Sequence, residues 1–317
     1  MLHGPRPKVS VIVLNLNNHK DTQDCLKSIQ RVEYPNFDVI VVDNGSSDDS
    51  CSRLRSEFPD TELLASKENL GFAGGNNLGI EYALQHGAAY ILLLNNDTVV
   101  DPSFLNQLVQ VAETDVRIGI LSPKIFYEAD PQRIWYAGGD VKYGSGTCRH
   151  LGLDQLDQEG KFSRVKDTDF ITGCAMVIRS KTLLDIGGLD SKLFAYWEDA
   201  DFCMRARKAG YRCVFVPTAR VWHKVSRTSG NRSPFTLYLT TRNQLIWVTK
   251  HVPFPYKPAA LALTFARKVL QTVPLGFKSR ASAAVWAGIW AFLFGVYGPP
   301  RQEREPETSV FITNCQN

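Results

Sequence analysis

The sequence predicts an α/β protein built on a doubly wound, mostly parallel sheet. Over the first hundred residues, short apolar runs alternate with helical stretches, as in a chain that passes repeatedly from strand to helix. Hydrophobic residues make up 44% of the 317 residues, enough to bury a large core. Several apolar runs end in Asn or Asp. Because ligands of open α/β sheets bind outside the carboxyl ends of the strands, these polar ends mark the expected site.

The predicted elements follow one another in regular order. Strands are expected at 9–14, 38–42, 61–65 and 91–94, with helices around 25–29, after 50 and over 71–87. The stretch 102–169 is loop-rich apart from a helix over 103–113. A strand over 170–178, a helix over 199–209 closed by Gly210, and a last strand over 213–216 before Pro217 complete the pattern.

Composition and charge exclude several classes of protein. The net charge is +4 and the pI about 8.6, with no run of Lys and Arg between aromatic residues, so a nucleic-acid partner is not expected. Seven scattered cysteines without a CxxC pair favour neither a zinc site nor a disulfide framework, and indicate a reducing compartment. The first eight residues contain no apolar signal region. We expect a cytoplasmic protein.

The first candidate site is the polar end of the apolar run 91–94. Asn95, Asn96 and Asp97 come directly after it. A carboxylate at a strand end can hold a divalent cation, and the cation can hold a phosphate. The same residues, followed by Thr98, would also serve as a turn and a helix cap, and the motif alone does not decide between the two interpretations.

Two further strand ends indicate a nucleotide site. Asn15, Asn17 and Asp43 follow the first two strands, and a carboxylate there can accept hydrogen bonds from a ribose hydroxyl or a base N–H. In the loop 69–79, beginning at Asn69, small residues such as Gly71 let the backbone approach a ligand, although tight helix–strand packing would explain the glycines equally. There is no GxGxxG after the first strand and no P-loop lysine, which disfavours a dinucleotide-binding fold.

An acidic cluster and a histidine complete the candidate residues. Glu198, Asp199 and Asp201 follow Trp197 at a helix start; their mutual repulsion raises the pKa of at least one carboxyl, which suits a general base. A helix cap beside a solvated acidic turn is the competing interpretation. His223 comes just after the last strand, where a neutral imidazole can bind a metal ion or can simply be a lone surface residue.

In this order, the segments closely resemble the inverting family 2 glycosyltransferases with the GT-A fold, over roughly residues 9–250. The pattern is most similar to the bacterial rhamnosyltransferase-like branch, which also carries Asn-Asn-Asp. The resemblance rests on 9–17, 41–48, 69–73, 95–97, 173–179, 188–190, 197–201, 222–223 and, for that branch, 239–243.

The resemblance implies roles on the donor side. Asp43, with Asn15, Asn17 and the Asn69–Gly71 loop, would hold the nucleoside, and Gly173 would let the donor sugar approach the backbone. Asp97 would be the last member of Asp-x-Asp and, with His223, would bind Mg²⁺ or Mn²⁺ and the diphosphate. Asn95 replaces the first acid and, like Asn96, offers only a neutral oxygen. Weak metal binding without the donor is therefore expected.

The resemblance also implies a reaction. Asp199 would be the catalytic base, while Glu198, with Trp197 and Asp201, would bind the acceptor. The expected activity is transfer of L-rhamnose from dTDP-rhamnose to a saccharide acceptor, free or lipid-linked, in bacterial cell-surface polysaccharide synthesis. The donor could instead be a UDP-hexose or UDP-furanose. A non-catalytic nucleotide-binding protein is a further alternative, and a nucleotidyltransferase is disfavoured because no basic, glycine-rich loop follows the first strand.

The domain prediction is a catalytic domain over 1–250, a helical region over 251–302 and a polar, disordered tail over 303–317. Residues 281–300 carry no charge, and Trp286, Trp290, Phe294 and Tyr297 recur at helical spacing between basic flanks. An amphipathic helix of this kind suits the inner face of the cell membrane. The alternatives are packing on the catalytic domain or against a second copy in a homodimer.

Overall fold

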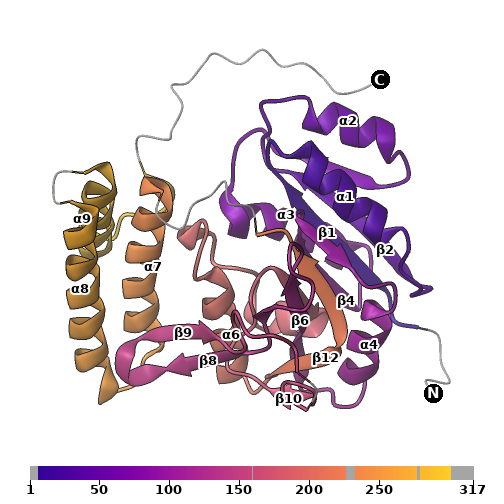
Figure 1. Cartoon of the computed structure of the whole chain (residues 1–317). Coiled ribbons are helices and arrows are strands. Elements are labelled where there is room, and N and C mark those ends of the chain that lie inside the picture. Colours follow the sequence, from indigo (N-terminus) through magenta and orange to yellow (C-terminus); the bar gives the residue numbers. More distant parts are fainter. Residues whose placement is uncertain (1–5, 159, 226–232, 277–278, 301–317) are drawn as a thin grey trace.

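The computed structural model describes residues 6–158, 160–225, 233–276 and 279–300 (Figure 1). A ten-stranded sheet crosses the molecule in the order β10-β12-β6-β11-β4-β1-β2-β3, with β5 paired to β12 and β7 to β6. The predicted doubly wound α/β fold with a mostly parallel sheet is confirmed.

The first half of the sheet has the predicted alternation. Strands β1, β2, β3 and β4 are all parallel to their neighbours in this group. The elements are β1 (Val9–Asn15), α1 (His19–Ile29), β2 (Phe37–Asp43), α2 (Ser50–Glu57), β3 (Glu62–Ala65), α3 (Gly71–Gln85) and β4 (Tyr90–Asn95).

The second half is mixed, because β11 is antiparallel to both β4 and β6, whereas β12 is parallel to β6. Its elements are β5 (Thr98–Val100), α4 (Phe104–Ala112), β6 (Ile118–Tyr127), β7 (Ile134–Tyr136), β8 (Gly139–Lys142), β9 (Thr147–His150), β10 (Lys166–Asp167), β11 (Ala175–Arg179), α5 (Ser180–Ile186), α6 (Glu198–Lys208) and β12 (Arg212–His223). Two 3₁₀ turns lie at Tyr143–Ser145 and Ser191–Leu193.

Alternating side chains of the strands divide the core into two layers. Val9, Val11 and Val13 of β1 pack with α1, α2 and α4 on one face of the sheet. Ile12 of the same strand packs with α3, α5 and α6 on the other. Because β1 and β4 are buried on both faces, their apolar runs are continuous, which is why the sequence predicts these strands so directly.

Three predictions for the second half need correction. The stretch 102–169 was expected to be loop-rich, yet it contains the ten-residue strand β6. The strand expected over 170–178 begins only at Ala175. The last strand was expected to end before Pro217 but continues to His223, because a register shift between Val216 and Arg220 places Pro217 in a bulge, where its missing N–H costs no ladder bond.

The helical region predicted after residue 250 contains α8 (Tyr256–Leu275) and α9 (Arg280–Leu293). Both pack against α7 (Pro234–His251), and Figure 1 shows the three helices as a layer beside the sheet domain. Among the described residues, no helix combines the length and hydropathy that crossing a bilayer requires. The tail predicted to be disordered, 303–317, lies outside the described residues.

Candidate active site

The carboxyl ends of β1, β2 and β4 meet at one edge of the sheet. The amide of Asn15 donates to Asp43 Oδ1 at 2.8 Å, and Asn15 Oδ1 accepts from the Thr22 hydroxyl at 2.8 Å. Thr22 in turn accepts from the amide of Asn96 at 2.9 Å. The structure therefore links three predicted donor-site residues, Asn15, Asp43 and Asn96, in one hydrogen-bonded chain. Thr22, which sequence reasoning missed, joins them.

The loop after β2 is tied to Asn17. Ser46 donates its hydroxyl to Asp43 at 2.6 Å and accepts the N–H of Asn17 at 2.9 Å. Asn17 Oδ1 accepts the N–H of Ser47 at 2.8 Å, from a left-handed backbone (φ +49°) that Asn tolerates well. Asp43 is 3% exposed and fixes this loop from within, whereas Asn17 and Ser47 are exposed.

A buried asparagine that the sequence analysis did not single out organises the loop before α3. Asn44 donates to Asn69 Oδ1 and to the carbonyl of Gly71, both at 3.1 Å, and accepts the N–H of Leu70 at 3.0 Å. The predicted residues Asn69 and Gly71 thus lie beside the end of β2. The sequence could have indicated Asn44, because it comes directly after Asp43 at the end of a predicted strand.

Gly71 is where this loop meets the acidic cluster. It has φ +72°, and a Cβ there would lie 2.5 Å from the carbonyl oxygen of Phe194. The same carbonyl accepts the N–H of Ala73 at 3.0 Å, in the first turn of α3. Glycine is therefore required both by the backbone conformation and by the close approach.

Asp97 and His223 form a pair at the edge between β4 and β12. His223 Nε2 lies 3.0 Å from Asp97 Oδ1, both residues are nearly buried, and His223 Nδ1 has no hydrogen-bond partner among the described residues. Burial favours the neutral imidazole, but the neighbouring Cys174 and Asp97 outweigh it and raise the pKa of His223 to about 10.

The pair fits a metal ion that takes its other ligands from elsewhere. Two adjacent ligands of an octahedral ion with bonds of about 2.1 Å lie about 3 Å apart, the separation that this pair shows. Within the described ranges, no cluster of three or more His, Cys, Asp or Glu could hold a metal. A metal here must also displace the imidazole proton. Asp97 and His223 could therefore supply two adjacent ligands of a metal ion.

Asp199 lies beside the start of β11. Its Oδ2 accepts the N–H of Gly173 at 3.0 Å, and its Oδ1 accepts the N–H of Ala200 at 2.7 Å. Gly173 is brought to this edge because the carbonyl of Cys174 accepts the N–H of Asn95 at 2.9 Å. Burial raises the pKa of Asp199, although the hydrogen bonds from the Gly173 and Ala200 N–H groups oppose the shift. A half-buried carboxylate of raised pKa suits a proton acceptor.

Glu198 differs from its neighbour. It is 5% exposed, and its Oε2 has no hydrogen-bond partner within the described part of the chain. Burial, and then the nearby charges of Asp199 and Asp201, raise its pKa well above the usual range. Glu198 therefore keeps its proton more readily than Asp199 and can donate a hydrogen bond to a ligand.

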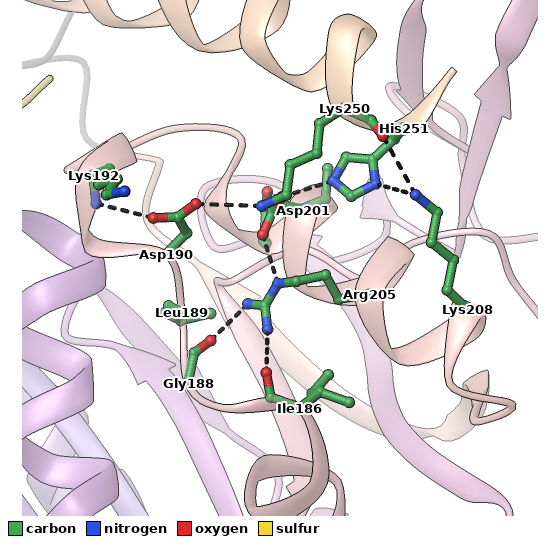
Figure 2. A network of polar contacts seen from close by, with 12 residues as sticks. Ile186, Gly188, Leu189, Asp190, Lys192, Asp201, Arg205, Lys208, Lys250 and His251 are labelled. Atoms are coloured by element: carbon green, nitrogen blue, oxygen red, sulfur yellow. Dashed lines mark hydrogen bonds and ion pairs between the residues drawn. The ribbon is translucent and has the colours of Figure 1, made fainter. Parts of the chain in front are cut away.

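Asp201 does not join the other acids. Figure 2 shows its carboxylate between Arg205, Lys250 and His251, with contacts of 2.7–2.8 Å. Burial works to raise the pKa of Asp201, but the hydrogen bonds from His251, Lys250 and Arg205 prevail and hold it below the ordinary value. Asp201 is only 1% exposed and joins α6 to the end of α7. We therefore do not propose that it binds the acceptor.

The segment before Glu198, residues 193–197, is strained and is held by α7; we call it the catalytic turn. Phe194, Tyr196 and Trp197 all have positive φ (+67°, +68° and +73°), a conformation that is costly for large side chains. The amide of the fully buried Asn243 donates to three carbonyls of this turn, those of Leu193, Ala195 and Tyr196, at 2.8–2.9 Å.

Arg242, also fully buried, acts on the same turn. Its Nη2 donates to the carbonyl of Leu193 at 3.0 Å, and its Nε donates to Asn243 at 2.8 Å. Its Nη1 donates to the carbonyl of Gly298, after α9. Sequence analysis had connected Arg242 and Asn243 with the family resemblance but had given them no role.

The structure therefore brings the Asp97–His223 pair and Asp199, on the N–H of Gly173, to the polar edge of the sheet. The mixed sheet with this polar edge is that of a GT-A glycosyltransferase. The chain belongs to glycosyltransferase-like family 2, whose family model matches residues 5–248.

Curated relatives of this chain include glycan-building enzymes. It is 28% identical over 244 residues to the low-salt glycan biosynthesis hexosyltransferase Agl10 of Haloferax volcanii, covering 75% of this chain and 74% of that protein. It is 26% identical over 211 residues to an N-acetylglucosaminyl-diphospho-decaprenol L-rhamnosyltransferase of Mycobacterium tuberculosis, covering 61% and 68%. By contrast, the chain spans only 25% of the Sinorhizobium fredii protein y4gI, to which it is 27% identical over 71% of its own length.

Solved structures agree on the fold. The chain superposes on GalNAc-T7 with UDP, GalNAc and Mn²⁺ at a TM-score of 0.63, with 16% identity, over 92% of this chain and 56% of that one. The mannosyltransferase PcManGT of Pyrobaculum calidifontis, in complex with GDP-Man and Mn²⁺, gives 0.57 with 18% identity over 92% and 88%.

Proposed function

We propose that this chain is an inverting hexosyltransferase that moves a sugar from a nucleotide diphosphate donor to a hydroxyl of a saccharide acceptor. The observation that carries the proposal is the placement of Asp199 on the N–H of Gly173, next to the strand end that leads to Asp97. A base beside the phosphate-binding edge is what a single displacement at an anomeric carbon requires.

The proposed reaction is one in-line step. Asp199 takes the proton of the acceptor hydroxyl while that oxygen forms a bond to the anomeric carbon. The bond from this carbon to the β-phosphate oxygen breaks, the electron pair leaves with the nucleoside diphosphate, and the configuration inverts. A divalent ion, Mg²⁺ or Mn²⁺, held by Asp97 and His223 would neutralise charge on the diphosphate.

The donor half would bind the nucleotide through the chain Asp43, Asn15 and Thr22 and through the loop of Asn17, Asn69 and Gly71. Asn95 and Asn96 would offer uncharged polar groups to the ribose or diphosphate. Gly173 would allow the sugar close to the backbone, and Trp197 with protonated Glu198 would orient the acceptor. These roles are those that the family resemblance implies, and the strand-end hydrogen bonds described above support the donor side of them.

For the donor sugar we propose L-rhamnose from dTDP-rhamnose, supported by the mycobacterial relative named above. A UDP-hexose or UDP-furanose is the second candidate, since Agl10 is named only as a hexosyltransferase. The acceptor would be a saccharide, free or lipid-linked, of the bacterial cell envelope. We place the reaction in the cytoplasm at the inner face of the membrane, with residues 1–250 as the catalytic domain and 251–302 as a helical attachment.

Replacing Asp199 tests the base. Asp199→Asn should lower turnover by about 10²- to 10⁴-fold, the range typical of general-base catalysis. Nucleotide-sugar binding, followed by calorimetry, should stay nearly unchanged. An Asn variant that retains turnover would overturn the base assignment, and one that loses donor binding would place Asp199 in the donor site.

The donor and metal are tested by thermal shift with dTDP-rhamnose and a panel of UDP-sugars, each with and without Mn²⁺ or Mg²⁺. We expect the metal alone to shift the melting temperature little and the metal with the donor to shift it most. Hydrolysis of the stabilising donor, with metal added, separates an enzyme from a protein that only binds nucleotides.

A further inference from the structure

The outer faces of α8 and α9 expose rows of apolar side chains. On α8, positions 259, 262, 263, 265, 266, 270 and 273 are exposed and are Ala, Leu, Phe or Val, with Arg267 exposed among them, and Leu270 is 64% exposed. On α9 and directly after it, positions 283, 286, 287, 290, 293 and 294 are exposed and are Ala, Trp, Leu or Phe, with Arg280 exposed at the start of the helix. Because water-facing helix surfaces are normally polar, rows of this composition mark a surface that another body covers.

Aromatic side chains stand at the α9 end of this surface. Trp290 is 57% and Phe294 70% exposed, and their rings stack with centroids 5.2 Å apart. Trp286 and Tyr297 are exposed near them, and Tyr256 lies at the start of α8. Trp and Tyr have an apolar ring with a polar edge, so they are the residues that favour a boundary between hydrocarbon and water.

The charge of the same region has one sign. Between Val252 and Pro300 the sequence has no Asp or Glu and five cations, namely Lys257, Arg267, Lys268, Lys278 and Arg280. This segment therefore carries +5, while the whole chain carries +4, which leaves −1 for the rest (4 − 5). Arg280 is exposed and Lys257 is half-buried, whereas Arg267 donates to the carbonyl of Ser145. The segment that carries the exposed apolar side chains is thus also the basic segment of the chain.

We infer that the outer face of α8 and α9 docks on the surface of an anionic lipid bilayer. The apolar rows and aromatic rings enter the boundary between headgroups and acyl chains, and the cations pair with anionic headgroups. A second copy fits this surface less well. In a two-fold dimer the face would meet itself, so cations would face cations with no acid among them. The inference does not require the transferase activity.

Co-sedimentation of the purified full chain with vesicles tests the inference. Vesicles of phosphatidylcholine alone are compared with vesicles that also contain the anionic lipid phosphatidylglycerol. Each is tested in about 0.05 M salt and in about 0.5 M salt, and the higher concentration screens surface charge. We expect binding only to the anionic vesicles at low salt, with a blue shift of indole fluorescence. Each basic residue near the surface contributes about fivefold to the affinity.

Two pairs of variants locate the surface, and each has a matched control. Trp290→Ser with Phe294→Ser should lower vesicle affinity at least tenfold, whereas Val116→Ser with Leu184→Ser, at apolar residues 78% and 72% exposed outside the helical layer, should not. Lys257→Gln with Arg280→Gln should lower it about 25-fold, and Lys27→Gln with Arg31→Gln on the α1 side should lower it far less.

Several outcomes would overturn the inference. They are the absence of binding to anionic vesicles, equal binding by the Trp290/Phe294 variant and the wild type, or a dimer that this variant converts to a monomer in sedimentation velocity. A last experiment deletes residues 301–317. If only the shortened chain binds vesicles, the chain's own tail covers the face, and the inference that the full chain docks on a bilayer is wrong.

Discussion

The two halves of the active site are held in place by different means. In the donor half, each polar side chain follows its own strand, and its partners come from the next strand end or the helix between, as with Asn15 and Asp43, which are 28 residues apart. The catalytic turn contains three residues of positive φ, and the carbonyls of Leu193, Ala195 and Tyr196 in it are held by Asn243, which follows Tyr196 by 47 residues. The first half needs only the sheet, whereas the second also needs α7. Changes in α7 should therefore damage catalysis more than nucleotide binding.

The largest effect on stability is expected at Asp201, which ties α6 to α7. Asp201→Asn leaves Arg205 and Lys250 without their buried carboxylate and should cost about 4 kcal/mol of unfolding free energy at pH 7. The pKa of Asp201 is depressed in the folded protein, so this stabilisation is present above the unfolded value of about 4 and is lost as the pH falls below it.

Urea denaturation at pH 7 and at pH 3 measures this. The difference between wild type and Asp201→Asn should shrink in acid. Asp49→Asn, in an ion pair whose side chains are 56% and 61% exposed, should change stability by less than about 1 kcal/mol. If Asp49→Asn lowered the unfolding free energy as much as Asp201→Asn does, the structural role of Asp201 would be contradicted.

The next effect tests the catalytic turn directly. Asn243→Ala removes the donor of three carbonyls and should cost about 3 kcal/mol. Since the turn leads into Glu198 and Asp199, kcat should fall about 10- to 100-fold, while the donor dissociation constant stays within about twofold.

The matched control is the next residue of α7. Gln244 is also buried, but it donates to the carbonyl of Gly146 at 2.9 Å, far from the turn. Gln244→Ala should lose stability but keep kcat. If both variants lose kcat equally, α7 acts through general stability alone and the distinction between the two halves fails.

A smaller effect is expected at the junction of the halves. Gly71→Ala places a Cβ against the Phe194 carbonyl at positive φ and should cost about 2 kcal/mol of unfolding free energy. The KM for the donor should rise and kcat should fall. Gly87→Ala has a similar φ of +74° but nothing within 4 Å, so about 1 kcal/mol of strain is expected without a change in kinetics. Thermal unfolding and initial rates measure both.

The smallest effect has the opposite sign. Glu198 is buried and its pKa is raised, so ionising it opposes folding increasingly as the pH rises above about 4, the unfolded value. Glu198→Gln mimics the protonated form and should stabilise the protein by about 1 kcal/mol at pH 8, with little change at pH 4. Loss of activity should accompany this gain. Equal melting temperatures of variant and wild type at pH 8 would show that the carboxyl of Glu198 does not destabilise the fold at that pH.

The donor half could largely be predicted from the sequence. Strands β1, β2 and β4 are apolar runs that end in Asn or Asp, and that pattern alone places Asn15, Asp43 and Asn96 at one edge. Strand β6 was missed because Ser122, Pro123 and Lys124 interrupt its apolar pattern, although Lys124 is buried through its ion pair with Asp157 at 2.7 Å. The strand is central because of its neighbours, not because of its composition.

The catalytic turn could not be predicted in the same way. Its acids were found because three carboxylates within four residues are conspicuous, but their different burial, pKa shifts and partners depend on the fold and on residues of α7. The positive φ of Phe194, Tyr196 and Trp197 leaves no mark in a sequence, and neither do the backbone carbonyls that Asn243 holds.

The carbonyl of Phe194 has a kinetic consequence. It accepts the N–H of Ala73 at the start of α3 and lies against Gly71, so one peptide group contacts both of the proposed substrate sites. A nucleotide sugar that orders the Gly71 loop should therefore also order residues 194–198, which lead to Asp199. We therefore expect compulsory order, with the nucleotide sugar entering first and the nucleoside diphosphate leaving last. In product-inhibition experiments, the nucleoside diphosphate should compete with the donor and not with the acceptor.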